Sequence, residues 1–138
     1  METDQMKTIP MFGYEIVRDY ILSSILGKHE GDVLYWAGKE VARKFPLFSM
    51  EEAATFFKEA GWGCLTLEKE SKDSRTYILT GDKDRLKIES RCFKIEAGFL
   101  AQQMQQHVGY LTECYEEKNV KQQCVKFILK SDLKEEIK

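Results

Sequence analysis

The sequence predicts an α+β domain in which helices pack on one face of a four-stranded antiparallel sheet, with elements in the order αααββαββ. Apolar residues recur at helical spacing through residues 11–60 and again through residues 93–108. Alternating apolar and polar residues occur in two pairs of runs, within residues 63–80 and 110–130, and each pair encloses a polar turn. Two hairpins favour an antiparallel sheet, and the helical stripes supply the layer that covers it.

The length and composition of the chain suit one domain with a core of its own. We expect this domain at residues 11–131, between a disordered lead at residues 1–10 and a polar tail at residues 132–138. Hydrophobic residues form 43% and charged residues 32% of the 138, as in ordinary soluble globular proteins. The net charge of −2 gives no signal for a nucleic-acid partner. No secretory signal or membrane-spanning run is present, so we expect a cytoplasmic protein without a membrane span.

Three helices are expected in the first sixty residues, at residues 11–26, 33–45 and 50–60. A glycine or a proline ends each of them. Ser49 and Glu52 have the spacing of a capping box at the start of the third helix. The aromatic residues on or beside these helices are expected in the core, although they could instead line an apolar ligand channel. They are Phe12, Tyr14, Tyr20, Phe45, Phe48, Phe56, Phe57 and Trp62.

The first hairpin is expected from strands at residues 63–68 and 75–80. The structure of residues 82–91 is less clearly indicated, because strand-like alternation competes there with a helix cap at Asp82. We favour a short helix or a loop for this segment.

The clearest helix is "FKIEAGFLAQQMQQHV", in which the apolar residues fall at intervals of 4, 3, 1, 3 and 4. We expect four glutamines on its opposite face, namely Gln102, Gln103, Gln105 and Gln106, and we expect the helix to end at Gly109. Gly98 lies near its start, where glycine costs up to ~1 kcal/mol relative to alanine. We therefore expect a neighbouring helix, a strand or a ligand wall in the space that a β-carbon would fill.

A second hairpin is expected from residues 110–115 and 124–130, around a turn at residues 117–120. If Cys114 lies opposite Cys124, strand alternation puts six side chains on the more apolar, buried face: Leu111, Glu113, Tyr115, Val125, Phe127 and Leu129.

Glu113 would then be buried, and a buried carboxylate needs a partner or a proton. It either lines a cavity or lies at the edge of the core, paired with a lysine or a tyrosine hydroxyl. The candidate ligand-binding residues are Glu113, Gly98, Phe127, Tyr115 and Leu111.

No complete catalytic or metal-binding set is present in the sequence. The cysteines, namely Cys64, Cys92, Cys114 and Cys124, are expected to be reduced thiols. Zinc requires three or four ligands, and His29 and His107 lack ligand spacing. His107 is the only candidate base for a cysteine nucleophile, and its place at a helix end explains it more simply. We therefore expect no catalytic residue, no metal and no cofactor.

Two stretches resemble known families. "FKIEAGFLAQQMQQHVGYLTECYEE" with "CVKFILKSD" resembles the closing half of the 4-vinyl-reductase domain, whose fold is shared with TRAPP vesicle-tethering subunits. "GKEVARKFPLFSMEEAATFFKEAGWG" with "EAGFLAQQ" resembles more closely the small YslB-type proteins of Bacillus, an uncharacterised family, over nearly the whole chain.

The wider resemblance implies a cavity for a small molecule or a lipid between helices and sheet, and dimers formed through the helices. Its zinc-binding members carry a pattern of the type Glu-x-x-Cys-x7-Cys on the last hairpin. Here Glu113 fits the acid of this pattern, but Glu116 stands at its first cysteine position. The resemblance therefore implies no metal site.

We expect a non-enzymatic homodimer, associated through its helical face, that binds an apolar or lipid-like small molecule or presents a surface to another protein. The alternative is a thiol-dependent or reductase-like enzyme or accessory factor, suggested by the four cysteines and by the name of the wider family.

Overall fold

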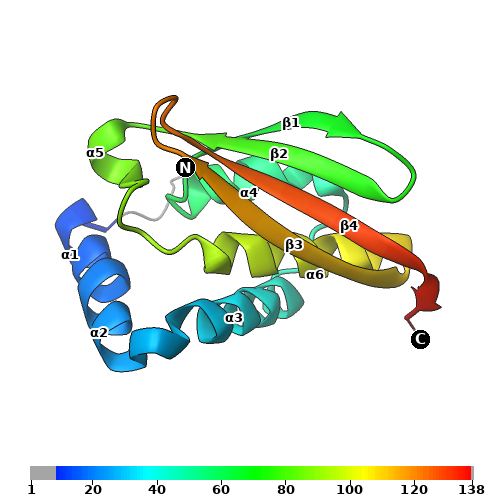
Figure 1. Ribbon diagram of the computed structural model, residues 1–138, viewed down its shortest axis with the longest axis horizontal. Helices are drawn as coiled ribbons and strands as arrows, with labels where there is room; N and C mark the ends of the chain where they lie inside the picture. Colours follow the sequence, from blue (N-terminus) through cyan, green and yellow to red (C-terminus); the bar gives the residue numbers. More distant parts are fainter. Residues whose placement is uncertain (1–8, 138) are drawn as a thin grey trace, which may run out of the picture.

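The computed structural model describes residues 9–137 and confirms the α+β class, with helices on one face of a four-stranded antiparallel sheet (Figure 1). Most of the disordered lead predicted at residues 1–10 lies outside the described residues. The elements are α1 (Met11–Glu15), the π-helical η1 (Ile16–Ile21), α2 (Leu22–Leu26), the 3₁₀ turn η2 (Gly27–His29), α3 (Glu30–Lys44), the 3₁₀ turn η3 (Met50–Glu52), α4 (Ala53–Glu59), β1 (Cys64–Glu70), β2 (Ser74–Thr80), α5 (Lys83–Leu86), α6 (Lys94–Val108), β3 (Tyr110–Asn119) and β4 (Cys124–Glu136).

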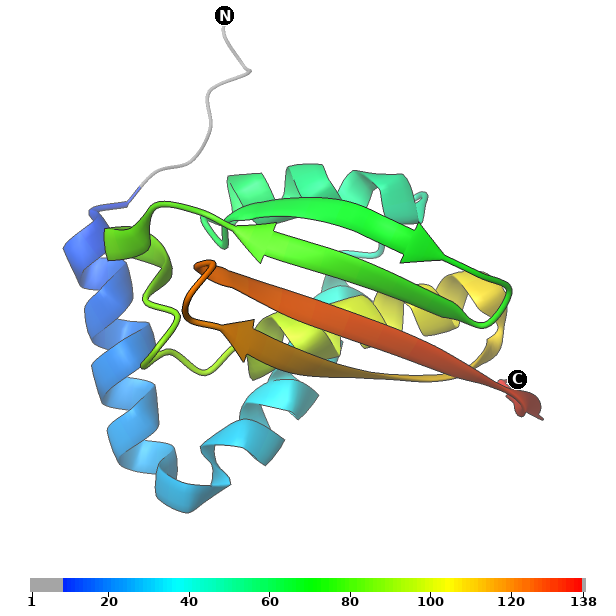
Figure 2. The same ribbon diagram turned by 45° about the horizontal axis from the view of Figure 1, so that its top comes forward.

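The sheet has the strand order β1-β2-β4-β3, and every neighbouring pair is antiparallel. In Figures 1 and 2 the strands lie in front of α4 and α6, with α4 behind β1 and α6 behind β3 and β4. The inner face is apolar, and its buried side chains include Leu65, Tyr77, Leu79, Val125, Phe127 and Leu129. The core therefore lies between this face and the two helices.

Helix α6 is buried on all sides over residues 96–104, since the sheet covers one side and α3 another. The prediction that its glutamines face solvent is wrong for Gln102 and Gln103, which are both buried. The amide of Gln103 accepts a hydrogen bond from the Leu47 N–H at 3.1 Å and donates one to the Phe45 carbonyl at 2.8 Å. Gln103 thereby satisfies backbone groups where the chain leaves α3.

Gly98 meets a helix, which is one of the neighbours predicted for it. A β-carbon on Gly98 would lie 2.9 Å from the carbonyl carbon of Tyr35 on α3, and closer still to its oxygen. Gly38 makes the reciprocal contact, because its β-carbon would lie 2.9 Å from the carbonyl carbon of Ile95 and from the Phe99 nitrogen. Two glycines thus allow the backbones of α3 and α6 to touch.

The register predicted for the second hairpin is wrong. Cys114 pairs with Leu129, and Cys124 pairs with Asn119, because the turn occupies residues 120–123 instead of 117–120. The shift is an odd number of residues, so every β3 side chain changes face. Thr112 and Cys114 face the core, and Glu113 is exposed where burial was predicted.

Helices α1, η1 and α2 form one continuous N-terminal helix, residues 11–26, that stands at one end of the domain (Figure 2). It bears few of the core side chains, and the prediction that its aromatic residues are in the core is wrong for Phe12 and Tyr20. The same correction applies to Phe45 and Phe48, which are also exposed.

Ion pairs fasten the inner side of this helix to residues 87–96. Arg18 pairs with Glu96, and both side chains are buried. The Arg91 guanidinium donates two hydrogen bonds of 2.9 Å to the Asp19 carboxylate. Burial would lower the pKa of Arg18, but the adjacent Glu96 carboxylate outweighs it, so the pKa is raised overall and the side chain stays charged.

Three local predictions have mixed outcomes. Asp82 caps the short helix α5 through the Asp84 N–H at 2.8 Å, as the favoured alternative required. Ser49 makes no side-chain cap, whereas Glu52 does reach back, to the Phe48 N–H at 2.8 Å. β4 continues to Glu136, where a polar tail was predicted from residue 132.

Candidate binding pocket

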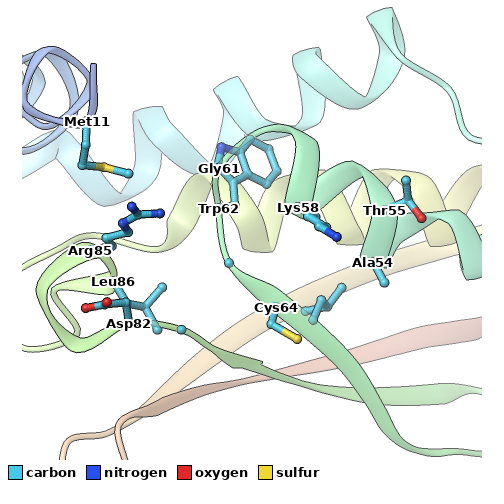
Figure 3. A pocket seen from close by; sticks show the side chains of 13 residues that line it. Met11, Ala54, Thr55, Lys58, Gly61, Trp62, Cys64, Asp82, Arg85 and Leu86 are labelled. Carbon is cyan, nitrogen blue, oxygen red and sulfur yellow. The ribbon is translucent and has the colours of Figure 1, made fainter. Parts of the chain in front are cut away.

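A pocket of about 530 Å³ opens beside α4, at the junction of four chain segments (Figure 3). Its walls come from the start of α1, from α4, from the turn and first strand at residues 61–65, and from residues 81–86. It opens to solvent, since Ala54, Thr55, Lys58 and Cys64 are exposed. The volume falls within the range of roughly 300–1,000 Å³ of small-molecule sites.

The inner wall is apolar and rigid. Trp62, Leu65 and Leu86 line the pocket and are at most 8% exposed. The backbone N–H of Trp62 donates a hydrogen bond to the Phe57 carbonyl at 2.8 Å, and the indole ring packs edge-on against the rings of Phe57 and Phe99. These contacts fix the indole from the core side while its other side faces the pocket.

The turn that presents Trp62 requires glycine on both sides. Gly61 and Gly63 have φ angles of 76° and 129°, in the region that side-chain-bearing residues rarely adopt. A β-carbon on Gly63 would also lie 2.9 Å from Leu79 Cδ1. The "GWG" stretch is the sequence signal for this wall, but the sequence analysis placed Trp62 in the core and identified no pocket there.

The rim carries two cations and one carboxylate. Lys58 of α4 and Arg85 of α5 lie on opposite sides of the Trp62 ring (Figure 3). Asp82 also borders the pocket, but its carboxylate accepts the Asp84 N–H as the cap of α5. Within residues 9–137, no carboxylate oxygen lies within 4.0 Å of the Lys58 or Arg85 nitrogens.

The five residues predicted to bind a ligand lie in separate places. Phe127 is fully buried on the inner face of the sheet, and Gly98 lies at the contact of α6 with α3. Glu113 and Tyr115 are exposed on β3, and Leu111 is half-buried near its start. None of the five lines the pocket beside α4. The structure does not bring these residues together in one site, and their role in ligand binding stays a prediction.

Glu113 lies at the free edge of β3. It contacts a tyrosine hydroxyl and a lysine, the partners expected if it lies at the edge of the core. The Tyr35 hydroxyl donates to its carboxylate, and Lys39 Nζ lies 3.5 Å away. The same hydroxyl accepts the Cys114 N–H at 3.0 Å. Burial and the bond to Glu113 raise the pKa of Tyr35. The carboxylate itself remains 59% exposed.

The cysteines differ in their surroundings. Burial raises the pKa of Cys114 strongly and that of Cys92 to a lesser degree, so both favour the neutral thiol at pH 7. Cys64 is exposed and borders the pocket, and no histidine is among the described residues that line it. Among the described residues, no three His, Cys, Asp or Glu side chains are grouped to hold a metal ion.

A family model described as "Protein of unknown function (DUF2507)" matches residues 11–130. "Uncharacterized protein YslB" of Bacillus subtilis (strain 168) is 40% identical over 139 residues, which cover 97% of this chain and 94% of that protein. Within the described part of the chain, no helix is both long and apolar enough to cross a membrane.

Two solved structures share the fold at low sequence identity. A vinyl-4-reductase family protein from Methanocaldococcus jannaschii superposes with a TM-score of 0.64 at 19% identity, over 91% of this chain and 83% of that one. A trafficking protein particle complex subunit 3 from Naegleria fowleri, covalently bound to palmitic acid, gives a TM-score of 0.55 at 13% identity, over 92% and 91%.

Proposed function

The chain belongs to the DUF2507 family, described as proteins of unknown function, and from this premise we propose that it is a cytoplasmic, non-enzymatic binding domain for an apolar or lipid-like small molecule. The pocket beside α4 is the observation that carries the proposal. Its rigid wall of Trp62, Leu65 and Leu86 gives an apolar ligand a surface to cover, and its volume of about 530 Å³ suits a small molecule.

Two further observations support binding without chemistry. Burial raises the pKa values of Cys92 and Cys114 and disfavours a thiolate at those two positions, and the described residues that line the pocket beside Cys64 include no histidine to serve as its base. The trafficking subunit of the same fold carries palmitic acid, so this architecture is compatible with a bound acyl chain.

Titration with Nile red, a neutral apolar dye, tests the proposal. Trp36 and Trp62 are the two tryptophans of the chain, so a Trp36→Phe background makes Trp62 the sole indole reporter. We expect saturable dye fluorescence together with quenching of Trp62. Ala54→Phe, which places a ring in the pocket, should reduce dye affinity at least about tenfold.

Thr66→Phe is the matched control, because Thr66 is exposed on the outer face of β1. It adds the same ring outside the pocket and should leave dye affinity unchanged. A wild-type protein that binds no dye at 100 µM protein, or an Ala54→Phe variant that binds it normally, would contradict the proposal.

A homodimer formed through the helical face is a second proposal, favoured by the outer side of the N-terminal helix. Its exposed residues within Ile16–Leu26 carry no charge and are Val17, Tyr20, Ile21, Ser24 and Ile25. An uncharged apolar surface of this kind marks an interaction site, and it can pair with itself across a two-fold axis without repulsion.

Light scattering coupled to size exclusion at tens of micromolar tests this association. We expect a dimer for the wild type and a monomer for Tyr20→Glu combined with Ile25→Glu, since each acid would lose its water at the interface. Thr66→Glu with Gln122→Glu adds the same charge elsewhere on the surface and should remain dimeric. A monomeric wild-type protein would contradict the proposal.

A further inference from the structure

The rim of the pocket suggests which polar group its ligand carries. We propose that the pocket selects amphiphiles with an anionic head, a carboxylate or a phosphate, bound at the rim by Lys58 or Arg85 while the apolar chain covers Trp62 and Leu86. This inference rests on the proposed binding function and adds the chemical class of the ligand.

The two cations border the pocket from different elements. Lys58 lies in the last turn of α4, and Arg85 lies in α5, so their positions are set independently on opposite sides of the Trp62 ring (Figure 3). Lysine offers a point charge and arginine a planar fork of donors, and both bind carboxylates and phosphates.

Neither cation is neutralised by a carboxylate contact within residues 9–137. Among the described lining residues Asp82 is the only acid. Its carboxylate accepts the Asp84 N–H, and in Figure 3 its oxygens point away from the Trp62 ring. The rim is therefore positive towards the space above the apolar wall, and that wall lowers the local dielectric.

Because the cations lie beside the apolar wall, the pocket favours a ligand that has both an anionic head and an apolar chain. An uncharged apolar molecule would leave the two cations without a partner, whereas a free inorganic anion would leave Trp62, Leu65 and Leu86 uncovered. An amphiphile satisfies both surfaces at once.

A series with one chain length and four head groups tests the inference. Decanoate, decyl phosphate, decanol and decyltrimethylammonium are titrated below their micelle concentrations into the Trp36→Phe protein, with calorimetry and Trp62 emission as readouts. We expect the two anions to bind at least about tenfold more tightly than decanol, and the cation to bind most weakly. Added salt should weaken the anions selectively.

Charge reversal identifies the residues responsible. Lys58→Glu combined with Arg85→Glu should abolish the preference for anions while decanol still binds, because both residues are exposed and outside the core. Lys72→Glu, in the turn between β1 and β2, is the control and should bind as the wild type does. Circular dichroism and thermal melting verify that each variant is folded.

Each outcome separates the two proposals. If decanol binds as tightly as decanoate, or if charge reversal leaves the preference intact, the head-group inference is overturned and the binding function stands. Inorganic phosphate that binds as tightly as decyl phosphate would likewise overturn it. If none of the amphiphiles binds and Nile red also fails, both proposals fall.

Discussion

Gly38 and Gly98 leave no room for a β-carbon between α3 and α6. Each faces the backbone of the other helix, and a backbone cannot move aside as a flexible side chain can. The helix-propensity cost of Gly98 is therefore offset by a close helix contact that larger residues would prevent.

Gly98→Ala should destabilise the protein by about 3 kcal/mol or more, because the new methyl group would overlap the Tyr35 carbonyl. Gly13→Ala is the matched control, since nothing lies within 4 Å of the position of its β-carbon. That helical substitution should be neutral or stabilise by up to about 1 kcal/mol. Urea unfolding measures both, and equal stabilities for the two variants would contradict the close contact.

Tyr35 gives a prediction for alkaline pH. Its pKa is raised above the ordinary 10.0, so the folded state keeps a proton that the unfolded chain loses. The free energy of unfolding should therefore be unaffected by this group below pH 10 and should fall as pH rises above it. Tyr35→Phe should reduce the slope by less than about 1.4 kcal/mol per pH unit.

Urea unfolding between pH 8 and pH 11.5 measures this slope. Part of it should persist in the variant, because burial also raises the pKa values of Tyr77, Cys92 and Cys114. Identical slopes for wild type and Tyr35→Phe would show that the hydroxyl is not protected.

At the scale of elements, the N-terminal helix is joined to the domain largely by charge. Its π-helical turn allows consecutive residues, Arg18 and Asp19, both to reach residues 91–96, and π-turns often mark functional segments. The inner side thereby carries paired charges beside the half-buried Tyr14, whereas the outer side is apolar and exposed.

Arg18→Met should cost about 3–5 kcal/mol, because it leaves the fully buried Glu96 carboxylate without its cation. Lys126→Met, which breaks the exposed pair of Lys126 with Glu68, should cost less than about 1 kcal/mol. Chemical denaturation compares the two variants. A small loss for Arg18→Met would indicate that water reaches Glu96 once the arginine is removed.

The elements that sequence patterns predicted well are those whose signals are local. Helical spacing located α3 and α6, and Asp82 marked the cap of α5. The register of β3 on β4 was missed because the turn at residues 120–123 contains no glycine or proline to mark it. That one error moved Glu113 from an exposed edge into the predicted core.

At the scale of the molecule, the pocket was beyond local patterns because four separated segments build it. Nothing in the spacing of Lys58 and Arg85 along the sequence shows that they border one pocket on either side of Trp62. The order of the strands and the path of residues 81–86 bring them there. The apolar residues of the N-terminal helix were visible, but their exposure depended on the ion pairs that turn its other side inward.

The rate at which each cysteine is labelled measures how readily the domain opens around it. We expect a thiol reagent at pH 8 to label exposed Cys64 first and buried Cys114 only on unfolding. Mass spectrometry of peptides over time measures the order, and Cys64→Ser should remove the fast phase. Rapid labelling of Cys114 in the folded protein would contradict the packing of β3 on α6.

The bond of Tyr35 to the free edge of β3 has a consequence for crowded solutions. Open strand edges invite other chains to extend the sheet, which begins aggregation. Here a phenol occupies the Cys114 amide, and the Glu113 carboxylate stands beside it as a fixed charge. An incoming strand would have to break the hydrogen bond between Tyr35 and the Cys114 amide and remove water from the Glu113 carboxylate. This edge therefore discourages fibril growth.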